Sequence, residues 1–148
     1  MTRIQTILFV CTHNSCRSQI AEGLTNHLTY NKYHAFSAGT EKTEVKPLAV
    51  SVLKELGIDI SSQYSKLISE AQARAAEFTK SDPEKFLFDI VITVCDNAKE
   101  ACPYLPGKIN IHRAFQDPSA VSGTEKEILK AYRDVRDEIK DWIIEEFK

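Results

Sequence analysis

The sequence predicts an α/β fold in which a parallel β-sheet is flanked by helices. Residues 6–10 form a continuous apolar run, which is typical of a strand buried on both faces, and residues 88–94 are the second strong strand candidate. Segments with helical spacing separate the candidate strands, and this alternation is typical of parallel sheets. Ligands bind beyond the carboxyl ends of such strands, so the residues that follow a strand are the first candidates for a functional site.

The first half of the chain contains two candidate strands and two candidate helices. In chain order we expect a strand over 6–10, a helix over 18–30, a strand over 35–39 and a helix over 47–56. Pro47 suits the first turn of a helix, and Gly57 suits the position just after its end. The helix over 18–30 has four residues at helical spacing on one side: Ile20, Leu24, His27 and Leu28.

The second half repeats this alternation and ends in a long amphipathic helix. We expect a helix over 69–80, a strand over 88–94, a weaker strand over 109–111 and a helix over 124–147. Thr124 and Glu127 have the spacing of a capping box at the start of the last helix. Because no repeat, linker or low-complexity stretch interrupts the pattern, we expect a single domain over residues 1–148.

The composition is that of an ordinary globular protein, with 43% hydrophobic and 27% charged residues. A formal net charge of -2 provides no general electrostatic attraction for nucleic acid or for an anionic membrane. No apolar stretch reaches the length of a membrane span, and the N-terminal residues do not resemble a signal peptide. We therefore expect a cytoplasmic protein without a nucleic-acid or membrane partner.

The four cysteines are best explained as reactive thiols. They are Cys11, Cys16, Cys95 and Cys102. Structural disulfides are disfavoured in a reducing cytosol, and the spacings do not match the short pairs of structural zinc sites. Cys11 and Cys95 each follow a strong candidate strand, so both are expected on the same rim of the sheet.

Residues 11–18 form a candidate oxyanion loop between a strand and a helix. Successive backbone N–H groups and the helix dipole attract an anion there, and Arg17 provides two parallel donors. The same field favours the Cys11 thiolate, to which Ser18 can donate a hydrogen bond. Cysteine and arginine at this spacing also fit a buried cysteine and a solvated arginine, but the position between strand and helix favours anion binding. The expected binding residues are Thr12, His13, Asn14, Ser15, Cys16, Arg17 and Ser18.

Two further features of the cysteines and the loop can be stated from the residues alone. Asn14 suits a left-handed position in the turn, whereas Cys16 has no evident chemical role and is expected to pack. Helix formers separate Cys95 from Cys102, and seven helical residues span about 10.5 Å between Cα atoms. A disulfide needs roughly 4.4–6.8 Å. If this segment is helical, the two thiols can therefore pair only after it unwinds. The alternative is that both are buried structural cysteines.

Residues 10–19, Val-Cys-Thr-His-Asn-Ser-Cys-Arg-Ser-Gln, resemble the low-molecular-weight protein tyrosine phosphatase superfamily, and specifically its thioredoxin-coupled arsenate reductases. The resemblance extends to Ser37-Ala38-Gly39-Thr40, Gly57-Ile58-Asp59, the segment 95–102 and Asp117-Pro118. It implies a low-molecular-weight phosphatase-like fold with a four-stranded parallel sheet flanked by helices.

The resemblance also implies arsenic detoxification through a redox-active disulfide. Cys11 attacks arsenate, Cys95 attacks Cys11 as arsenite leaves, and Cys102 attacks Cys95. Thioredoxin then reduces the disulfide between Cys95 and Cys102. Arg17 is implied to hold the adduct and Asp117 to act as the acid. No cofactor is implied.

Two positions depart from the family pattern. His13 stands where many relatives have glycine, so its side chain either narrows the mouth of the loop or remains exposed. Some relatives hold a potassium ion with residues that match Asn14, Glu22 and Ser37, together with a later acidic residue. Lys66 stands at that later position. We expect its ammonium group to pair with Glu22, and no bound metal.

Two alternative functions remain open. One is a low-molecular-weight protein tyrosine phosphatase whose extra cysteines only regulate Cys11. Ser119-Ala120 stands where such phosphatases commonly have tyrosines, which weakens this alternative. The other is a thiol-rich protein that binds arsenite or a metal without turnover. The stretch 69–85 is longer than is usual in the family that the chain resembles, and it indicates no function.

Overall fold

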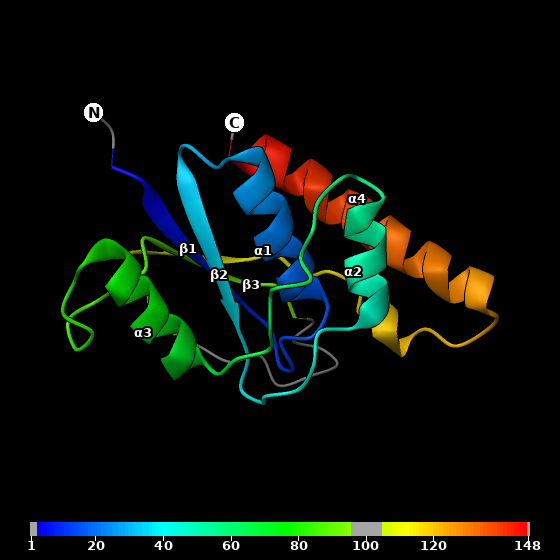
Figure 1. Cartoon of the computed structure of the whole chain (residues 1–148), viewed down its shortest axis with the longest axis horizontal. Helices are drawn as coiled ribbons and strands as arrows, with labels where there is room; N and C mark the ends of the chain where they lie inside the picture. The colour runs from blue at the N-terminus through cyan, green and yellow to red at the C-terminus, as the bar shows by residue number, and fades with distance from the viewer. Residues whose placement is uncertain (1–2, 96–104, 148) are drawn as a thin grey trace.

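The structure is a computed structural model that describes residues 3–95 and 105–147. Within them, four parallel strands form one sheet in the order β2-β1-β3-β4, with helices on both faces (Figure 1). The predicted α/β class and the four-stranded parallel sheet are confirmed. The strands are β1 (Gln5–Val10), β2 (Tyr33–Ala38), β3 (Ile90–Thr93) and β4 (Ile109–His112).

The helices lie close to their predicted positions. They are α1 (Arg17–Leu28), α2 (Pro47–Lys54), α3 (Ile68–Thr79), the short 3-10 helix η1 (Pro118–Ala120) and α4 (Glu125–Glu146). The capping box of α4 is present, because Glu127 N–H donates to Thr124 Oγ1 at 3.1 Å and Thr124 N–H donates to Glu127 Oε1 at 3.3 Å. Gly57 has a φ of 76°, a conformation that favours glycine, just beyond α2. No helix in the described part of the chain is long and apolar enough to cross a membrane.

The sheet separates two apolar cores. Helices α1, α2 and α4 cover one face of the sheet, and α3 covers the other (Figure 1). Ile7 and Phe9 of β1 belong to the core under α1, α2 and α4, whereas Leu8 and Val10 belong to the core under α3. Successive side chains of a strand point to opposite faces, so a strand buried on both sides needs an uninterrupted apolar run. This requirement explains the continuous run over residues 6–10.

The buried side of α1 differs from the prediction at its C-terminal end. Ile20 and Leu24 are fully buried, but His27 is exposed and Leu28 is 37% exposed. Small residues complete the buried side instead. A Cβ atom on Gly23 would lie 2.5 Å from a methyl group of Ile60, so glycine allows α1 to approach this neighbour closely.

The carboxyl ends of β1 and β3 lie side by side at the centre of the sheet. Val10 pairs with Thr93, and Val94 N–H donates to the carbonyl oxygen of Val10 at 3.0 Å. Cys11 and Cys95 therefore follow neighbouring strand ends, as the sequence predicted. This central rim is where a doubly covered parallel sheet exposes a binding site.

Candidate active site

Residues 11–18 connect β1 to the first turn of α1. Each of these residues is described by the structure, and His13 is the only exposed one among them. Asn14 is fully buried and has a φ of 51°, which confirms its predicted left-handed conformation. The loop is therefore a tight turn whose inner side chains are withdrawn from solvent.

Outside donors hold two carbonyl groups of the loop away from its centre. The Thr12 carbonyl accepts hydrogen bonds from the N–H groups of Thr40 at 2.9 Å and Glu41 at 3.1 Å, and the Ser15 carbonyl accepts one from Lys46 N–H at 2.8 Å. The C=O and N–H of a trans peptide group point in opposite directions. The N–H groups of these peptides consequently face the inside of the loop, as binding an oxyanion requires.

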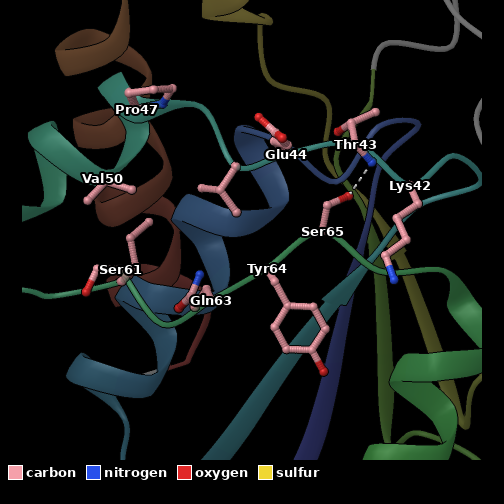
Figure 2. A pocket seen from close by; sticks show the side chains of 11 residues that line it. Lys42, Thr43, Glu44, Pro47, Val50, Ser61, Gln63, Tyr64 and Ser65 are labelled. Atoms are coloured by element: carbon pink, nitrogen blue, oxygen red, sulfur yellow. Dashed lines mark hydrogen bonds between the residues drawn. The ribbon is translucent and has the colours of Figure 1, made fainter.

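Two hydroxyl groups hold the carbonyl group of His13 in the same way. Thr43 Oγ1 donates to it at 2.9 Å and Ser65 Oγ at 3.1 Å, while Thr43 N–H donates to Ser65 Oγ at 2.9 Å (Figure 2). Both residues line an open pocket of about 540 Å³ beside the loop. Thr43 and Ser65 were not predicted from the sequence, because single hydroxyl residues in polar segments have no distinguishing pattern.

Cys11, the predicted nucleophile, lies at the start of the loop. Its side chain is buried, and its Sγ lies 2.8 Å from Ser18 Oγ. Asn14 Nδ2 donates to the same Ser18 oxygen at 2.8 Å. This oxygen accepts from Asn14, so its own proton is available for a hydrogen bond to the sulfur. The helix that begins at Arg17 adds the positive end of its dipole.

Arg17 and Asp117 lie together, although a hundred residues separate them. Arg17 is 4% exposed, and its NH1 group donates to the carbonyl oxygen of Phe115 at 3.2 Å. Its NH2 group is 3.7 Å from Asp117 Oδ2. The other carboxylate oxygen of Asp117 accepts from Ser119 N–H at 2.9 Å and from Ser119 Oγ at 2.7 Å. The predicted acid therefore has a fixed position beside the predicted anion-binding arginine.

Cys16 is a buried thiol in the core beneath the loop. It is 3% exposed and contacts Tyr132 of α4, whose hydroxyl forms a hydrogen bond with it. Burial, with a smaller contribution from the negative charge of Asp117, raises the pKa of the Cys16 thiol far above its usual value. A protonated, packed thiol agrees with the packing role expected for this residue.

Cys95 lies just beyond β3, on the same rim as Cys11. It is fully buried and disulfide-bonded, whereas Cys11 and Cys16 are free thiols. Cys95 and Cys11 belong to the same apolar core. Cys102 and the helix predicted between Cys95 and Cys102 lie outside the described residues.

Lys66 occupies a buried polar site behind the loop. Its ammonium group donates to the carbonyl oxygens of Ser37 and Tyr64, both at 3.1 Å, and lies 3.7 Å from Glu22 Oε1. Ser37 Oγ donates to the same Glu22 oxygen at 2.7 Å, and Lys66 N–H donates to Asn14 Oδ1 at 2.9 Å. The predicted pairing of Lys66 with Glu22 is present, and it links this site to the Asn14 side chain.

Burial acts on both members of this ion pair. It raises the pKa of Glu22 and lowers the pKa of Lys66, and in each case the charge of the partner opposes the effect. The charge of each group therefore favours the charged form of the other. The pair, rather than either residue alone, supports the back of the loop.

A phosphatase-type oxyanion loop on a four-stranded parallel sheet defines a known class of protein. Residues 6–146 match the family described as low molecular weight phosphotyrosine protein phosphatase, and the chain belongs to this family. A solved low molecular weight protein tyrosine phosphatase from T. tengcongensis is 25% identical, with a TM-score of 0.64 over 97% of this chain and 99% of that chain.

Within this family, the chain is similar to arsenate reductases. The arsenate reductase of Halalkalibacterium halodurans is 40% identical over 134 residues, which are 90% of this chain and 88% of the relative. That of Bacillus subtilis is 39% identical over the same shares of both chains. A solved structure described as an arsenate reductase in the phosphate binding state is 31% identical, with a TM-score of 0.71 over 96% of this chain and 95% of that chain.

Proposed function

We propose that this chain is an arsenate reductase that uses Cys11, Cys95 and Cys102 in a thiol–disulfide relay, with thioredoxin as the final reductant. The observation behind the proposal is the position of Cys95, buried beyond β3 on the same rim as the Cys11 loop. Hydrolysis of a phosphate ester needs only one nucleophilic thiol, so a second cysteine on this rim favours redox chemistry. The similarity to arsenate reductases supports the same function.

The first step is nucleophilic attack of the Cys11 thiolate on the arsenic atom of arsenate. An arsenic–oxygen bond breaks, and the oxygen leaves as water after receiving a proton from Asp117. Arg17 and the inward N–H groups of the loop hold the remaining oxygens. The product is a covalent adduct with a Cys11 sulfur–arsenic bond, in which arsenic is still As(V).

The second step reduces the arsenic. The Cys95 thiolate attacks the sulfur of Cys11, and the sulfur–arsenic bond breaks with its electron pair on arsenic. Arsenic becomes As(III) and leaves as arsenite, while the two thiols lose two electrons and form a disulfide.

The last steps return Cys11 to its thiol form. Cys102 attacks Cys95 and releases Cys11, and thioredoxin supplies two electrons to reduce the disulfide between Cys95 and Cys102. The cycle needs a compartment that keeps thiols reduced, so we propose that the protein acts in the cytoplasm.

The decisive experiment measures the oxidation of reduced thioredoxin by the full chain in the presence of arsenate. We expect arsenate-dependent oxidation that Cys11→Ser, Cys95→Ser and Cys102→Ser each abolish. Inorganic phosphate in place of arsenate is the matched control, because it binds the same loop but is not reduced. Hydrolysis of aryl phosphates without any arsenate-dependent oxidation would favour the phosphatase alternative. Sustained turnover by Cys102→Ser with thioredoxin alone would exclude the three-thiol relay.

A further inference from the structure

The short helix η1 places a hydroxyl group beside the predicted acid. Asp117 directly precedes η1, and Ser119 lies in its middle. The Asp117 Oδ1 atom accepts hydrogen bonds from Ser119 N–H at 2.9 Å and from Ser119 Oγ at 2.7 Å. A carboxylate oxygen has two lone pairs, so these two donors occupy Oδ1. The other oxygen, Oδ2, lies 3.7 Å from Arg17 NH2, which is too long for a hydrogen bond.

This arrangement determines which oxygen of Asp117 carries the proton of the acid form. A carboxylic acid donates only through the oxygen to which its proton is bonded. Because the Ser119 N–H group can only donate and the hydroxyl donates to the same atom, a proton on Oδ1 would have to displace one of them. Oδ2 is therefore the oxygen that bears the proton, and it is the oxygen on the side of Arg17.

The backbone around Asp117 is held in place, so the direction of its side chain is what Ser119 adds. On one side, the Phe115 carbonyl accepts a hydrogen bond from Arg17 at 3.2 Å. On the other side, Ala120 N–H donates to the Asp117 carbonyl at 3.2 Å. The carboxyl group itself is 34% exposed, so burial alone does not restrict its rotation. The two bonds from Ser119 supply this restriction.

We propose that Ser119 is a positioning residue that directs the proton of Asp117 to Oδ2, on the side of the oxyanion that Arg17 holds. The proposal rests on the proposed function, because it specifies how the acid of that reaction works. When the arsenic–oxygen bond breaks, its electron pair stays on a departing hydroxide, and the Oδ2 proton converts this hydroxide into water. Solvent returns a proton to the partly exposed carboxylate before the next turnover.

The rate at which arsenate produces the Cys11–Cys95 disulfide tests the proposal. The reaction is run in the full chain with Cys102→Ser, at several arsenate concentrations, and the quenched products are measured by mass spectrometry. We expect Ser119→Ala to lower the maximal rate about five- to tenfold and to leave the half-saturating arsenate concentration unchanged, because only the acid is misdirected. Ser119→Thr keeps the hydroxyl group and the parent rate. Ser122→Ala, on an exposed serine of the same segment, is the matched control.

A second background separates positioning from a general effect on the fold. Asp117→Asn removes the acid, and we expect it to slow the same reaction about a hundredfold. Ser119→Ala added to Asp117→Asn should slow the reaction no further, because Ser119 acts only through the carboxyl group of Asp117. A purely structural role of Ser119 would instead lower the rate equally in both backgrounds.

The possible failures of this proposal and of the relay can be told apart. Ser119→Ala that stays within about twofold of the parent rate, or that slows the Asp117→Asn chain equally, overturns the positioning role and leaves the relay intact. Asp117→Asn that reacts as fast as the parent overturns the acid, and the role of Ser119 with it. A parent chain that forms no Cys11–Cys95 disulfide with arsenate overturns the proposed function itself.

Discussion

The sulfur of Cys11 lies at the end of two consecutive hydrogen bonds inside its own loop. Asn14 donates to Ser18, and Ser18 in turn reaches the sulfur, each over 2.8 Å. Asn14 is itself held by Lys66 N–H through its other amide atom. The Ser18 hydroxyl therefore links the Cys11 sulfur, through Asn14, to the buried polar site around Lys66.

Substitution of this serine tests the hydrogen bond directly. We expect Ser18→Ala to slow alkylation of Cys11 by iodoacetamide at about pH 7, because the thiolate loses a donor. A hydrogen bond to a charged group contributes about 1.5 kcal/mol, so the expected effect is about tenfold. Ser61→Ala, on an exposed serine beside the pocket (Figure 2), is the control and leaves the rate unchanged. Equal alkylation rates in both variants would contradict the role of Ser18.

The ion pair between Lys66 and Glu22 makes a prediction about stability. Lys66→Met leaves the Glu22 carboxylate buried without its partner, and we expect a loss of about 3–5 kcal/mol in the free energy of unfolding. Glu22→Gln in the same chain should recover most of this loss, because the unpaired charge is then removed. Urea unfolding of the native chain, the single variant and the double variant measures both effects. A double variant no more stable than Lys66→Met would contradict the coupling.

At the scale of elements, a charged network ties α2 to α4. Arg133 donates to both carboxylate oxygens of Glu55, with a shortest distance of 2.7 Å, and Arg136 donates to Glu55 Oε1 at 2.7 Å. Arg136 also donates to the carbonyl oxygen of Val52 at 2.9 Å. The hydrogen bonds from Arg133 and Arg136 lower the pKa of Glu55 to about 2.

This lowered pKa predicts how stability changes in acid. Because the value lies below the ordinary 4.5, the contribution of the Glu55 carboxylate is fully present above that pH and is lost as the pH falls toward about 2. We expect Glu55→Gln to lower the thermal midpoint at about pH 6 and to converge with the native chain near about pH 2. Thermal unfolding across this range measures the difference, with Glu77→Gln on the exposed side of α3 as the control. A constant difference at all pH values would contradict the network.

The elements differ in how well the sequence predicts them. The start of α4 is clear from Thr124 and Glu127, because a capping box depends only on neighbouring residues. The strand β4 was a weaker prediction since it is an edge strand, and its Ile109 is 55% exposed. The prediction that Leu28 lies on the buried side of α1 was wrong, because Leu28 is 37% exposed. Small residues such as Gly23 lie on the buried side instead and allow the helix to pack closely.

At the scale of the whole molecule, the relay predicts one product. After a single turnover with arsenate and without thioredoxin, we expect mass spectrometry to find a disulfide between Cys95 and Cys102, with Cys11 and Cys16 reduced. In the Cys102→Ser chain the same measurement should find Cys11 bonded to Cys95, because the second exchange is blocked. A bond between Cys11 and Cys16 as the main product would contradict the relay.

The sequence by itself determined the fold class, the oxyanion loop and the polar residues within it. These features depend on residues close together in the chain, such as Cys11 and Ser18, which are seven positions apart. The partners of the loop come from elsewhere: Ser65 is 52 positions from His13, and Asp117 is a hundred positions from Arg17. Their hydrogen bonds and charges act only over a few ångströms, so they exist only after parallel pairing of the strands brings these segments to one rim. Tertiary structure therefore decided which residues surround the loop, including Ser65 and Asp117.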